Sequence, residues 1–251
     1  MKRNLLIIIL MSLSGLFSCA QLSPATKKQL DSVQSSLKQE YYQNSTSQEL
    51  WQVGQWSLYK TSSITRDGVF YLFDSSLNKG FVQILVAAAE GGSFWLELRI
   101  VSNDKEQHIA ALISEELIAG DLKYKIKQLK VDDNRNARNY LEAELLDGEG
   151  EEQLGEINVW LNFIIHSARE GTHRNVDLPA GEFLHVREVP ITMSLWLGQM
   201  SGYVWYHNAV PIFPVAKFEL TTSTTQWSNM TETAELVDFG NLGQKSYFSY
   251  E

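Results

Sequence analysis

The sequence has one cysteine, Cys19, among 251 residues, and only five prolines. A chain with one thiol forms no internal disulfide and no zinc site from several cysteines. Basic residues are also few, at 21 against 30 acidic ones, and the formal net charge is −9. With this excess of acidic residues we expect no basic patch on the surface, and therefore no nucleic acid partner.

The single cysteine follows an N-terminus of the kind that directs export. Lys2 and Arg3 precede an unbroken apolar run at residues 5–11, and smaller and polar residues follow. This order is typical of a secretory signal. The apolar run is far shorter than the roughly 20 residues that a membrane-spanning helix requires. We therefore predict that residues 1–18 are a signal peptide.

The stretch Leu16-Phe17-Ser18-Cys19 resembles the lipobox of bacterial lipoproteins, with Leu three positions before the cysteine and a small residue directly before it. The resemblance implies cleavage before Cys19, a diacylglyceryl group on its sulfur and a further acyl chain on the new amine. Two or more acyl chains hold a protein firmly on a membrane. The alternative is ordinary secretory cleavage near residues 18–21, with Cys19 incidental.

The residue after the cysteine and the charge of the remaining chain bear on location. Ala20 occupies the position where Asp would resemble an inner-membrane retention signal, and this favours the outer membrane. Removal of residues 1–18 leaves 19 basic and 30 acidic residues, a formal net charge of −11. Anionic head groups repel such a chain, so we expect the lipid anchor to make the membrane contact. The predicted location is the outer membrane, on its periplasmic face.

Residues 19–48 are expected to form the lipidated tether and an amphipathic helix. Ser23 and Pro24 fit the N-cap and first position of a helix. The apolar stripe of this helix, at steps of three and four residues, comprises Leu30, Val33, Leu37 and Tyr41. The stripe could pack on the rest of the chain, lie on the membrane or pair with another chain, and we favour the first. Residues 49–251 are then expected to form a single β-rich domain.

The clearest β signal is a hairpin between residues 81–89 and 94–101. The connecting residues 90–93 include Gly91 and Gly92, which adopt the positive φ of tight turns. Residues of the second run alternate between an apolar face and a mixed face that carries Trp95. A sheet that is apolar on both faces needs two covers. We expect a helix on one side and, on the other, a ligand such as an acyl chain or the second layer of a sandwich.

The middle of the chain gives mixed signals. Two segments fit a helix or a strand equally, namely residues 107–120 and 140–146. Alternating lysines predict a strand over residues 122–131, and the acidic residues 147–156 predict a turn or mobile loop. The apolar residues 157–167 predict a buried strand. The C-terminal third is rich in β-branched and aromatic residues and predicts further strands.

Three stretches resemble segments of a set of uncharacterised bacterial exported and outer-membrane proteins. They are VGQWSLYK with GGSFWLEL, VDLPAGEFLHV, and GYVWYHNAVPI with VAKFEL and AELVDFG. The resemblance spans residues 51–240 and includes the patterns PAGxF, WYxxxVP and ELVxFG. It implies a meander of curved strands, similar to the half-barrels of periplasmic carriers and receptors that shelter lipoprotein acyl chains. It implies no catalytic residues.

Together these signals predict a mainly β fold of the α+β kind. We expect a curved antiparallel sheet, either a half-barrel or a β-sandwich, with an N-terminal amphipathic helix. The seven tryptophans are the most suggestive side chains for binding. The candidate ligand-binding residues are Trp95, Trp160, Trp205 and Tyr206. The alternative is that these aromatic residues fill an ordinary core.

No pattern in the sequence points to catalysis. The five histidines are His108, His166, His173, His185 and His207, and none lies four residues from another, as in zinc proteases. A Ser-x-x-Lys pattern occurs at Ser35 and Lys38, but within the expected tether helix. We find no nucleophile elbow and no phosphate-binding loop. We therefore expect no metal, no cofactor and no enzymatic activity.

The leading functional hypothesis is a non-enzymatic outer-membrane lipoprotein that binds a lipid, an acyl chain or an envelope protein. The alternative is a structural or assembly module of the cell envelope that contacts partners through a sheet edge or the tether helix. A hydrolase with residues scattered along the chain is a third hypothesis.

The lipobox resemblance makes a direct prediction about the processed N-terminus. Mass spectrometry of the native protein should detect a peptide that begins at Cys19 and carries a diacylglyceryl group and an amine-linked acyl chain. The Cys19→Ala variant should lose these groups and leave the membrane fraction. An unmodified Cys19, or an N-terminus downstream of it, would contradict the prediction.

Overall fold

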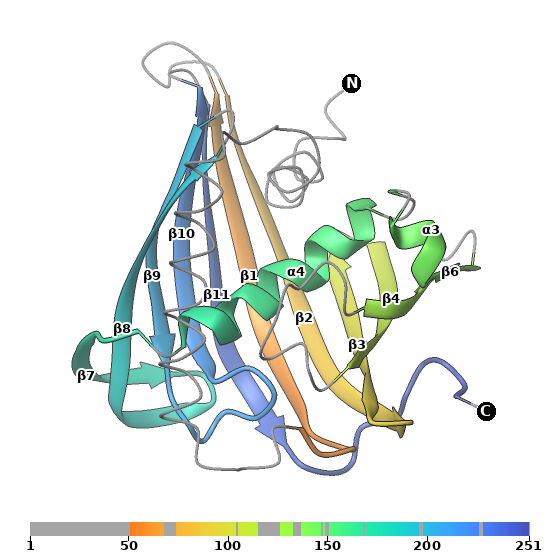
Figure 1. Ribbon diagram of the computed structural model, residues 1–251. Coiled ribbons are helices and arrows are strands. Elements are labelled where there is room, and N and C mark those ends of the chain that lie inside the picture. Colours follow the sequence, from red (N-terminus) through yellow and green to blue (C-terminus); the bar gives the residue numbers. More distant parts are fainter. Residues whose placement is uncertain are drawn as a thin grey trace, which may run out of the picture.

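The computed structural model describes residues 51–67, 74–103, 105–114, 126–132, 137–146, 148, 151–167, 169–195, 198–225 and 228–250. Within these residues, one antiparallel sheet of 11 strands bends into an open half-barrel (Figure 1). The strands are β1 (Trp56–Asp67), β2 (Asp74–Glu90), β3 (Ser93–Ser102), β4 (Lys105–Ser114), β5 (Ile126–Asp132), β6 (Ala137–Leu141), β7 (Thr172–Leu178), β8 (Gly181–Leu195), β9 (Gly198–Tyr206), β10 (Val215–Thr225) and β11 (Ser228–Gly240). The described helices are α3 (Glu142–Leu146) and α4 (Glu151–His166).

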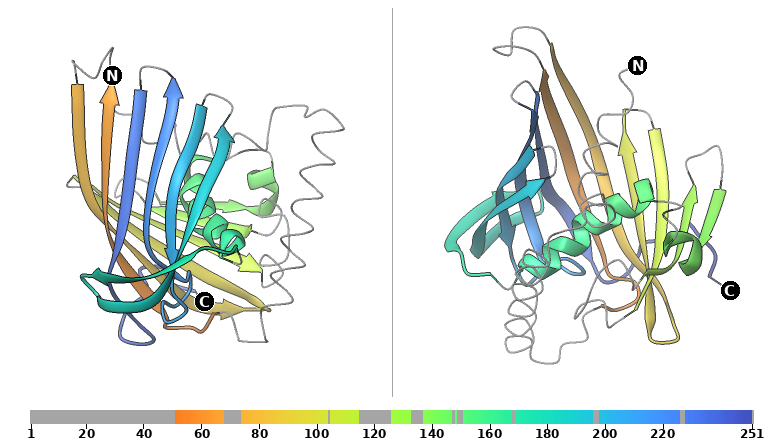
Figure 2. Two further views of the ribbon diagram at one scale, coloured as in Figure 1. Left: turned by 90° about the vertical axis from the view of Figure 1, so that its left-hand side faces the viewer. Right: turned by 45° about the horizontal axis from the view of Figure 1, so that its top comes forward.

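Two meanders make up the sheet, and they meet at its centre. The strand order is β6-β5-β4-β3-β2-β1-β11-β10-β9-β8-β7, so β1 to β6 form one half and β7 to β11 the other. The first and last strands pair antiparallel, from Trp56 opposite Gly240 to Asp67 opposite Ser228. The α3–α4 segment links the two meanders, and α4 lies across the inside of the curve (Figure 2).

The pleat of the strands gives the sheet two different faces, because side chains that lie opposite each other point to the same side. On the concave face, Tyr59 lies opposite Val82 and Leu236, and all three are buried. On the convex face, Lys60 lies opposite the exposed Phe81. The main core therefore lies on the concave side, between the sheet and α4.

The predicted hairpin is confirmed as β2 and β3. Gly91 and Gly92 form its turn with φ of 54° and 73°. Leu96 and Leu98 are buried on the concave face, as the alternation predicts. Trp95 points to the convex face and is also buried, so this part of the sheet is covered on both sides.

The PAGxF stretch forms the turn between β7 and β8. Gly181 has a φ of 125°, which favours glycine. The Ala180 amide donates a hydrogen bond of 3.3 Å to the Leu236 carbonyl, and Phe183 lies 6.1 Å from Phe239, between ring centroids. These contacts join the β7–β8 turn to β11 although three strands lie between β7 and β11. They show how strongly this half of the sheet curves.

The predicted buried strand over residues 157–167 is wrong, because this segment belongs to α4. The buried side chains recur at the helical steps of three and four residues, namely at Ile157, Trp160, Leu161 and Ile164. The segment looked continuous because partly buried apolar residues occupy other sides of this enclosed helix. The predicted acidic loop is also wrong from Glu151 onward, since α4 begins there. Acidic residues suit the first turn of a helix, where the dipole is positive.

The two segments that fit a helix or a strand equally, residues 107–120 and 140–146, have different structures. Residues 105–114 form β4, which is buried along most of its length, and residues 115–120 lie outside the described residues. The other segment ends β6 at Leu141 and then forms α3. The expected strand over 122–131 is confirmed from Ile126 onward as β5, and residues 122–125 lie outside the described part.

The mainly β prediction holds, and the sheet is a single curved layer of the half-barrel kind, not a sandwich. The signal peptide, Cys19 and the expected tether helix all lie outside the described residues. Within the described residues, no helix has the length and apolar character needed to cross a membrane.

The side chain of Trp160 is central to the packing of α4 on the sheet. Its ring centroid lies 4.6 Å from that of Tyr59, 5.8 Å from Phe213 and 5.9 Å from Phe218. Replacement of Trp160 by Ala should lower the free energy of unfolding by about 3–5 kcal/mol, because it leaves a large cavity. Chemical denaturation measures this change. The control Tyr203→Ala removes a half-exposed aromatic ring from the convex face and should cost about 1 kcal/mol or less.

Candidate functional site

A cavity of about 110 Å³ lies on the concave face, between α4 and the centre of the sheet. Its apolar wall includes Val82, Ile100, Trp160 and Phe218. The remaining lining residues are Thr61, Ser62, Ser63, Asn78, Lys79, Gly80, Val101, Ser102, Val159, Glu232 and Thr233. One water needs about 10–15 Å³ of such space. The cavity therefore has room for a polar group of several atoms, beside an apolar wall.

Glu232 gives this cavity an acidic group. It lies on β11, opposite Ser63 of β1 and Leu220 of β10, in the series Met230, Glu232, Ala234 and Leu236 that faces the concave side. Burial raises the pKa of the Glu232 carboxyl to about 7. Within the described part of the chain, no ion pair or hydrogen bond to this carboxyl is found. The acid is therefore held in a shielded place without a partner.

Ser63 adds a second unused polar group beside Glu232. Ser63 is 7% exposed, and its hydroxyl oxygen has no hydrogen-bond partner among the residues that the structure describes. A buried hydroxyl without a partner costs free energy, so such groups usually bind water or a ligand. Two neighbouring strands thus each present an unsatisfied polar group to the same cavity.

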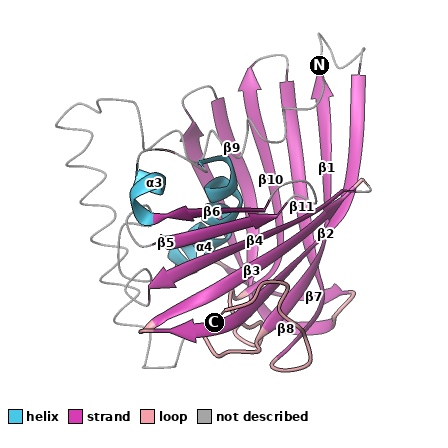
Figure 3. Ribbon diagram, turned by 90° about the vertical axis from the view of Figure 1, so that its right-hand side faces the viewer, coloured by secondary structure: helices cyan, strands magenta, loops and turns pink. Residues whose placement is uncertain are grey.

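The convex face has a second hollow, beneath the C-terminal segment, which we define as residues 241–250. Figure 3 shows this segment on the opposite side of the sheet from α3 and α4. Glu97 of β3 holds it in place although this acid is only 6% exposed. Its carboxylate accepts hydrogen bonds from the Ser246 hydroxyl at 2.6 Å, the Tyr247 amide at 3.0 Å, the Phe248 amide at 3.2 Å and the Tyr250 hydroxyl at 2.5 Å. These four donors offset the cost of burying the charge.

Aromatic and cationic groups complete this attachment. The Lys130 amine lies 4.7 Å from the ring centroids of both Trp95 and Tyr250, and these two rings lie 4.8 Å apart. The Tyr247 ring stacks on His108 at 3.5 Å, and its hydroxyl donates to Asp132 at 2.9 Å. The C-terminal segment therefore covers Trp95 on the convex face.

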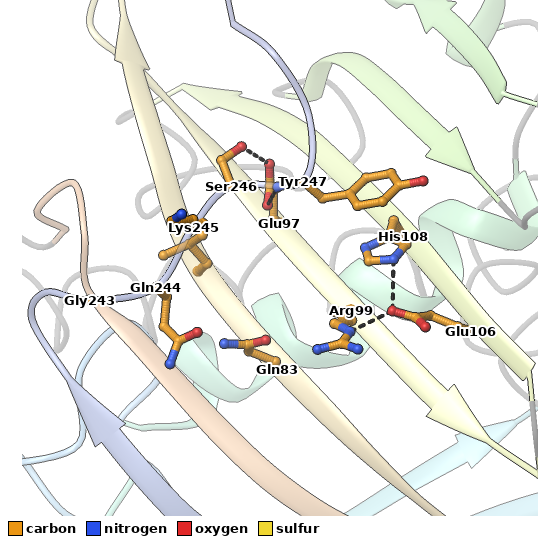
Figure 4. A pocket seen from close by; sticks show the side chains of 11 residues that line it. Gln83, Glu97, Arg99, Glu106, His108, Gly243, Gln244, Lys245, Ser246 and Tyr247 are labelled. Atoms are coloured by element: carbon orange, nitrogen blue, oxygen red, sulfur yellow. Dashed lines mark hydrogen bonds and ion pairs between the residues drawn. The ribbon is translucent and has the colours of Figure 1, made fainter.

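The hollow beneath this segment measures about 510 Å³ and is lined by polar side chains (Figure 4). Within it, one Glu106 oxygen accepts from Arg99 at 2.6 Å and lies 3.0 Å from the His108 ring nitrogen. Burial lowers the pKa of His108, and the nearby Glu106 opposes that change. The Arg99 guanidinium lowers the pKa of Glu106 through its hydrogen bond. The three groups thus bind one another on the floor of the hollow.

The structure separates the four residues predicted to bind a ligand. Trp160 lines the concave cavity. Trp95 lies on the convex face under the C-terminal segment. This segment is therefore the second cover of the sheet, for which the sequence had left a ligand and a sandwich layer as alternatives. Trp205 also faces the convex side, beside Tyr203 and Lys217. Tyr206 is on the concave face, opposite Val215.

Tyr206 belongs to a small group of buried polar atoms at the end of α4. Its hydroxyl, Nδ1 of His166 and Nε of Arg187 all lack a hydrogen-bond partner. Arg187 lies over the Tyr206 ring and donates a hydrogen bond to the Ser167 carbonyl, next to His166. Burial, aided by the charge of Arg169, lowers the pKa of His166 to about 4. This neutral histidine and the arginines form a polar end to the concave face.

Sequence reasoning missed Glu232 and the role of Glu97. The signal for Glu232 was present, because it is an acid in an alternating series that is otherwise apolar. The role of Glu97 depends on residues about 150 positions later in the chain, and no local sequence pattern predicts that contact. Within the described residues, no group of three or more His, Cys, Asp or Glu side chains is placed to hold a metal ion.

Comparisons with known proteins give little further information. No protein-family model matches the sequence, and no curated protein matches it. Among solved structures, the chain is similar to the hypothetical protein CT021 from Chlamydia trachomatis, with a TM-score of 0.30 and 10% sequence identity. That match covers 86% of this chain and 96% of the other. A likeness of this size assigns neither a family nor a function.

The contacts of Glu97 predict that it controls attachment of the C-terminal segment. In Glu97→Ala, four hydrogen bonds are lost, and proteolytic removal of the last residues should become at least about tenfold faster. Mass spectrometry of a carboxypeptidase time course measures the rate. Glu219→Ala, which removes an exposed acid elsewhere on the convex face, is the matched control and should leave the rate unchanged. Equal rates in both variants would contradict the assigned role.

Proposed function

We propose that this chain is a lipid-anchored protein of the outer membrane whose β-sheet domain binds an amphipathic ligand on its concave face. The domain acts without catalysis and faces the periplasm. The anchor and location rest on the sequence, namely the export-type N-terminus and the lipobox resemblance at Cys19. The ligand site rests on the structure.

One observation carries the proposed binding function, namely the cavity between α4 and the sheet. Ligand sites are typically concave and mostly apolar, with a few polar groups that orient the ligand. This cavity has an apolar wall around Trp160, the buried Ser63 hydroxyl, and the partly buried carboxyl of Glu232, and neither polar group has a hydrogen-bond partner among the described residues. Its volume of about 110 Å³ suits the polar end of a ligand and the first carbons of its chain.

The convex hollow favours a hydrolase as a second candidate, because His108 and Glu106 meet there. Two observations weaken this candidate. The His108 ring is stacked under Tyr247, and its nitrogen is already engaged with Glu106. The single hydroxyl hydrogen of Ser246 is shared between two acceptors, Glu97 and the Phe248 carbonyl. A binding role at the concave cavity therefore remains our proposal.

The proposed function predicts saturable binding of a twelve-carbon amphiphile. The protein would be made without residues 1–18 and with Cys19→Ala, and then titrated with dodecanol, dodecanoate or dodecylammonium below their micelle concentrations. Quenching of tryptophan fluorescence reports binding near Trp160. At least one amphiphile should bind, and lipid from the host should co-purify and be detected by mass spectrometry.

A cavity-filling variant locates the binding site. Val159→Phe enlarges a partly buried residue of the cavity wall and should weaken binding about tenfold or more. Val53→Phe makes the same change at a half-exposed position and is the control. The proposed function is wrong if none of the three amphiphiles binds, or if Val159→Phe and Val53→Phe bind them equally.

A further inference from the structure

The position of Glu232 indicates the chemistry of the ligand's polar end. Its two cross-strand neighbours, Ser63 and Leu220, are a hydroxyl and an apolar side chain, and neither neutralises a carboxylate. The helix side of the cavity adds Val159 and Trp160, which bring no charge. The acid is therefore surrounded by groups that do not compensate its charge.

Lys79 is the one basic residue among those that line the cavity. It lies opposite Ser62, and the Ser62 hydroxyl is hydrogen-bonded to Thr233 at 2.8 Å on the convex side of the pleat. Lys79 is also exposed to solvent, and it makes no ion pair with Glu232. The structure thus places a basic residue at the margin of the cavity and leaves the interior acid unpaired.

A shielded carboxyl has two ways to avoid an uncompensated charge. It can hold a proton, or it can bind a cation that donates hydrogen bonds. The unsatisfied Ser63 hydroxyl and the Thr61 hydroxyl are further acceptors on the same wall. A primary ammonium has three N–H donors, and this set of acceptors matches it in number. An anionic head group would instead be repelled by the negative charge of Glu232.

We propose that the concave cavity binds the primary ammonium group of a cationic or zwitterionic amphiphile, with Glu232 as its counter-ion and Ser63 as a second acceptor. This inference rests on the proposed binding function and specifies the head group that the same site takes. The apolar wall formed by Val82, Ile100 and Phe218 contacts the first carbons of the ligand.

The same arrangement makes binding dependent on pH. The carboxyl of Glu232 has a pKa of about 7, raised by burial from an ordinary value of 4.5. Among the lining residues, Glu232 and Lys79 are the titratable groups. Glu232 is mostly protonated at pH 6 and mostly ionised at pH 8. An alkylammonium resembles Lys, with a pKa of about 10.4, and remains charged at both values. Its affinity should therefore rise from pH 6 to pH 8.

The experiment compares three probes with the same chain and different head groups. Dodecylammonium should bind at least about tenfold more tightly than dodecanol at pH 8, because the ion pair forms in a shielded place. The advantage should shrink at pH 6. In Glu232→Gln the two probes should bind alike at both pH values. Lys79→Gln removes the other charged lining residue and is the matched control, in which the preference for the ammonium should persist.

Stability gives a readout that needs no ligand. Between pH 5 and 8 the unfolded chain loses the Glu232 proton first, while the folded chain keeps it until about pH 7. The unfolding temperature of the unmodified chain should therefore fall as the pH rises from 5 to 8. The fall should be smaller in Glu232→Gln, which has no carboxyl at this position. If that variant does not fold, Ser63→Ala serves in its place and should selectively weaken dodecylammonium binding.

The outcomes separate this inference from the function on which it rests. Binding of none of the probes overturns both. Equal binding of dodecylammonium and dodecanol overturns the ammonium site and leaves the binding function in place. Preferred binding of dodecanoate also overturns it, and would point to the polar group at His166, Arg187 and Tyr206. A preference for dodecylammonium that survives in Glu232→Gln assigns the selectivity to other residues and overturns the role of Glu232.

Discussion

The pairing of β1 with β11 is the constraint on which the rest of the structure depends. It joins two meanders that would otherwise be separate sheets, and it runs for the whole length of β1. Glu232, Ser63 and Tyr59 lie on these two strands, so the central ladder also positions the concave cavity. A single curved sheet keeps its shape only if its concave face is filled, and α4 fills it with Trp160 and its aromatic neighbours.

The apolar side chains on the two faces of the sheet are covered in different ways. On the concave side a helix supplies aromatic side chains and leaves a small cavity with polar atoms. On the convex side, an extended segment is attached through one buried acid, Glu97. The contrast between the two acids is informative. Glu97 accepts four hydrogen bonds from the chain itself, whereas Glu232 receives none from the described residues, and this difference separates a structural carboxylate from a candidate binding group.

Much of the fold followed from local patterns, because strands with one buried face alternate with a period of two. The β2–β3 hairpin was predicted from alternation and from Gly91 and Gly92, which have positive φ in the structure. Residues 157–167 were predicted as a strand because seven of these eleven residues are apolar, which obscures the difference between a helix and a strand. Of the candidate site, Trp160 was predicted from its aromatic character. Its proximity to Glu232 was not, since the two residues meet only when α4 packs on the folded sheet.

The central ladder also has a kinetic consequence for the growing chain. Trp56 pairs with Gly240, so β1 finds its partner only after more than 180 further residues have been synthesised. Until then, β1 presents one unpaired edge, and the apolar face of the first meander has no complete cover. Contacts between residues so far apart in the sequence form slowly, and open strand edges promote aggregation. A nascent chain of this topology therefore carries an open strand edge until β11 has been synthesised.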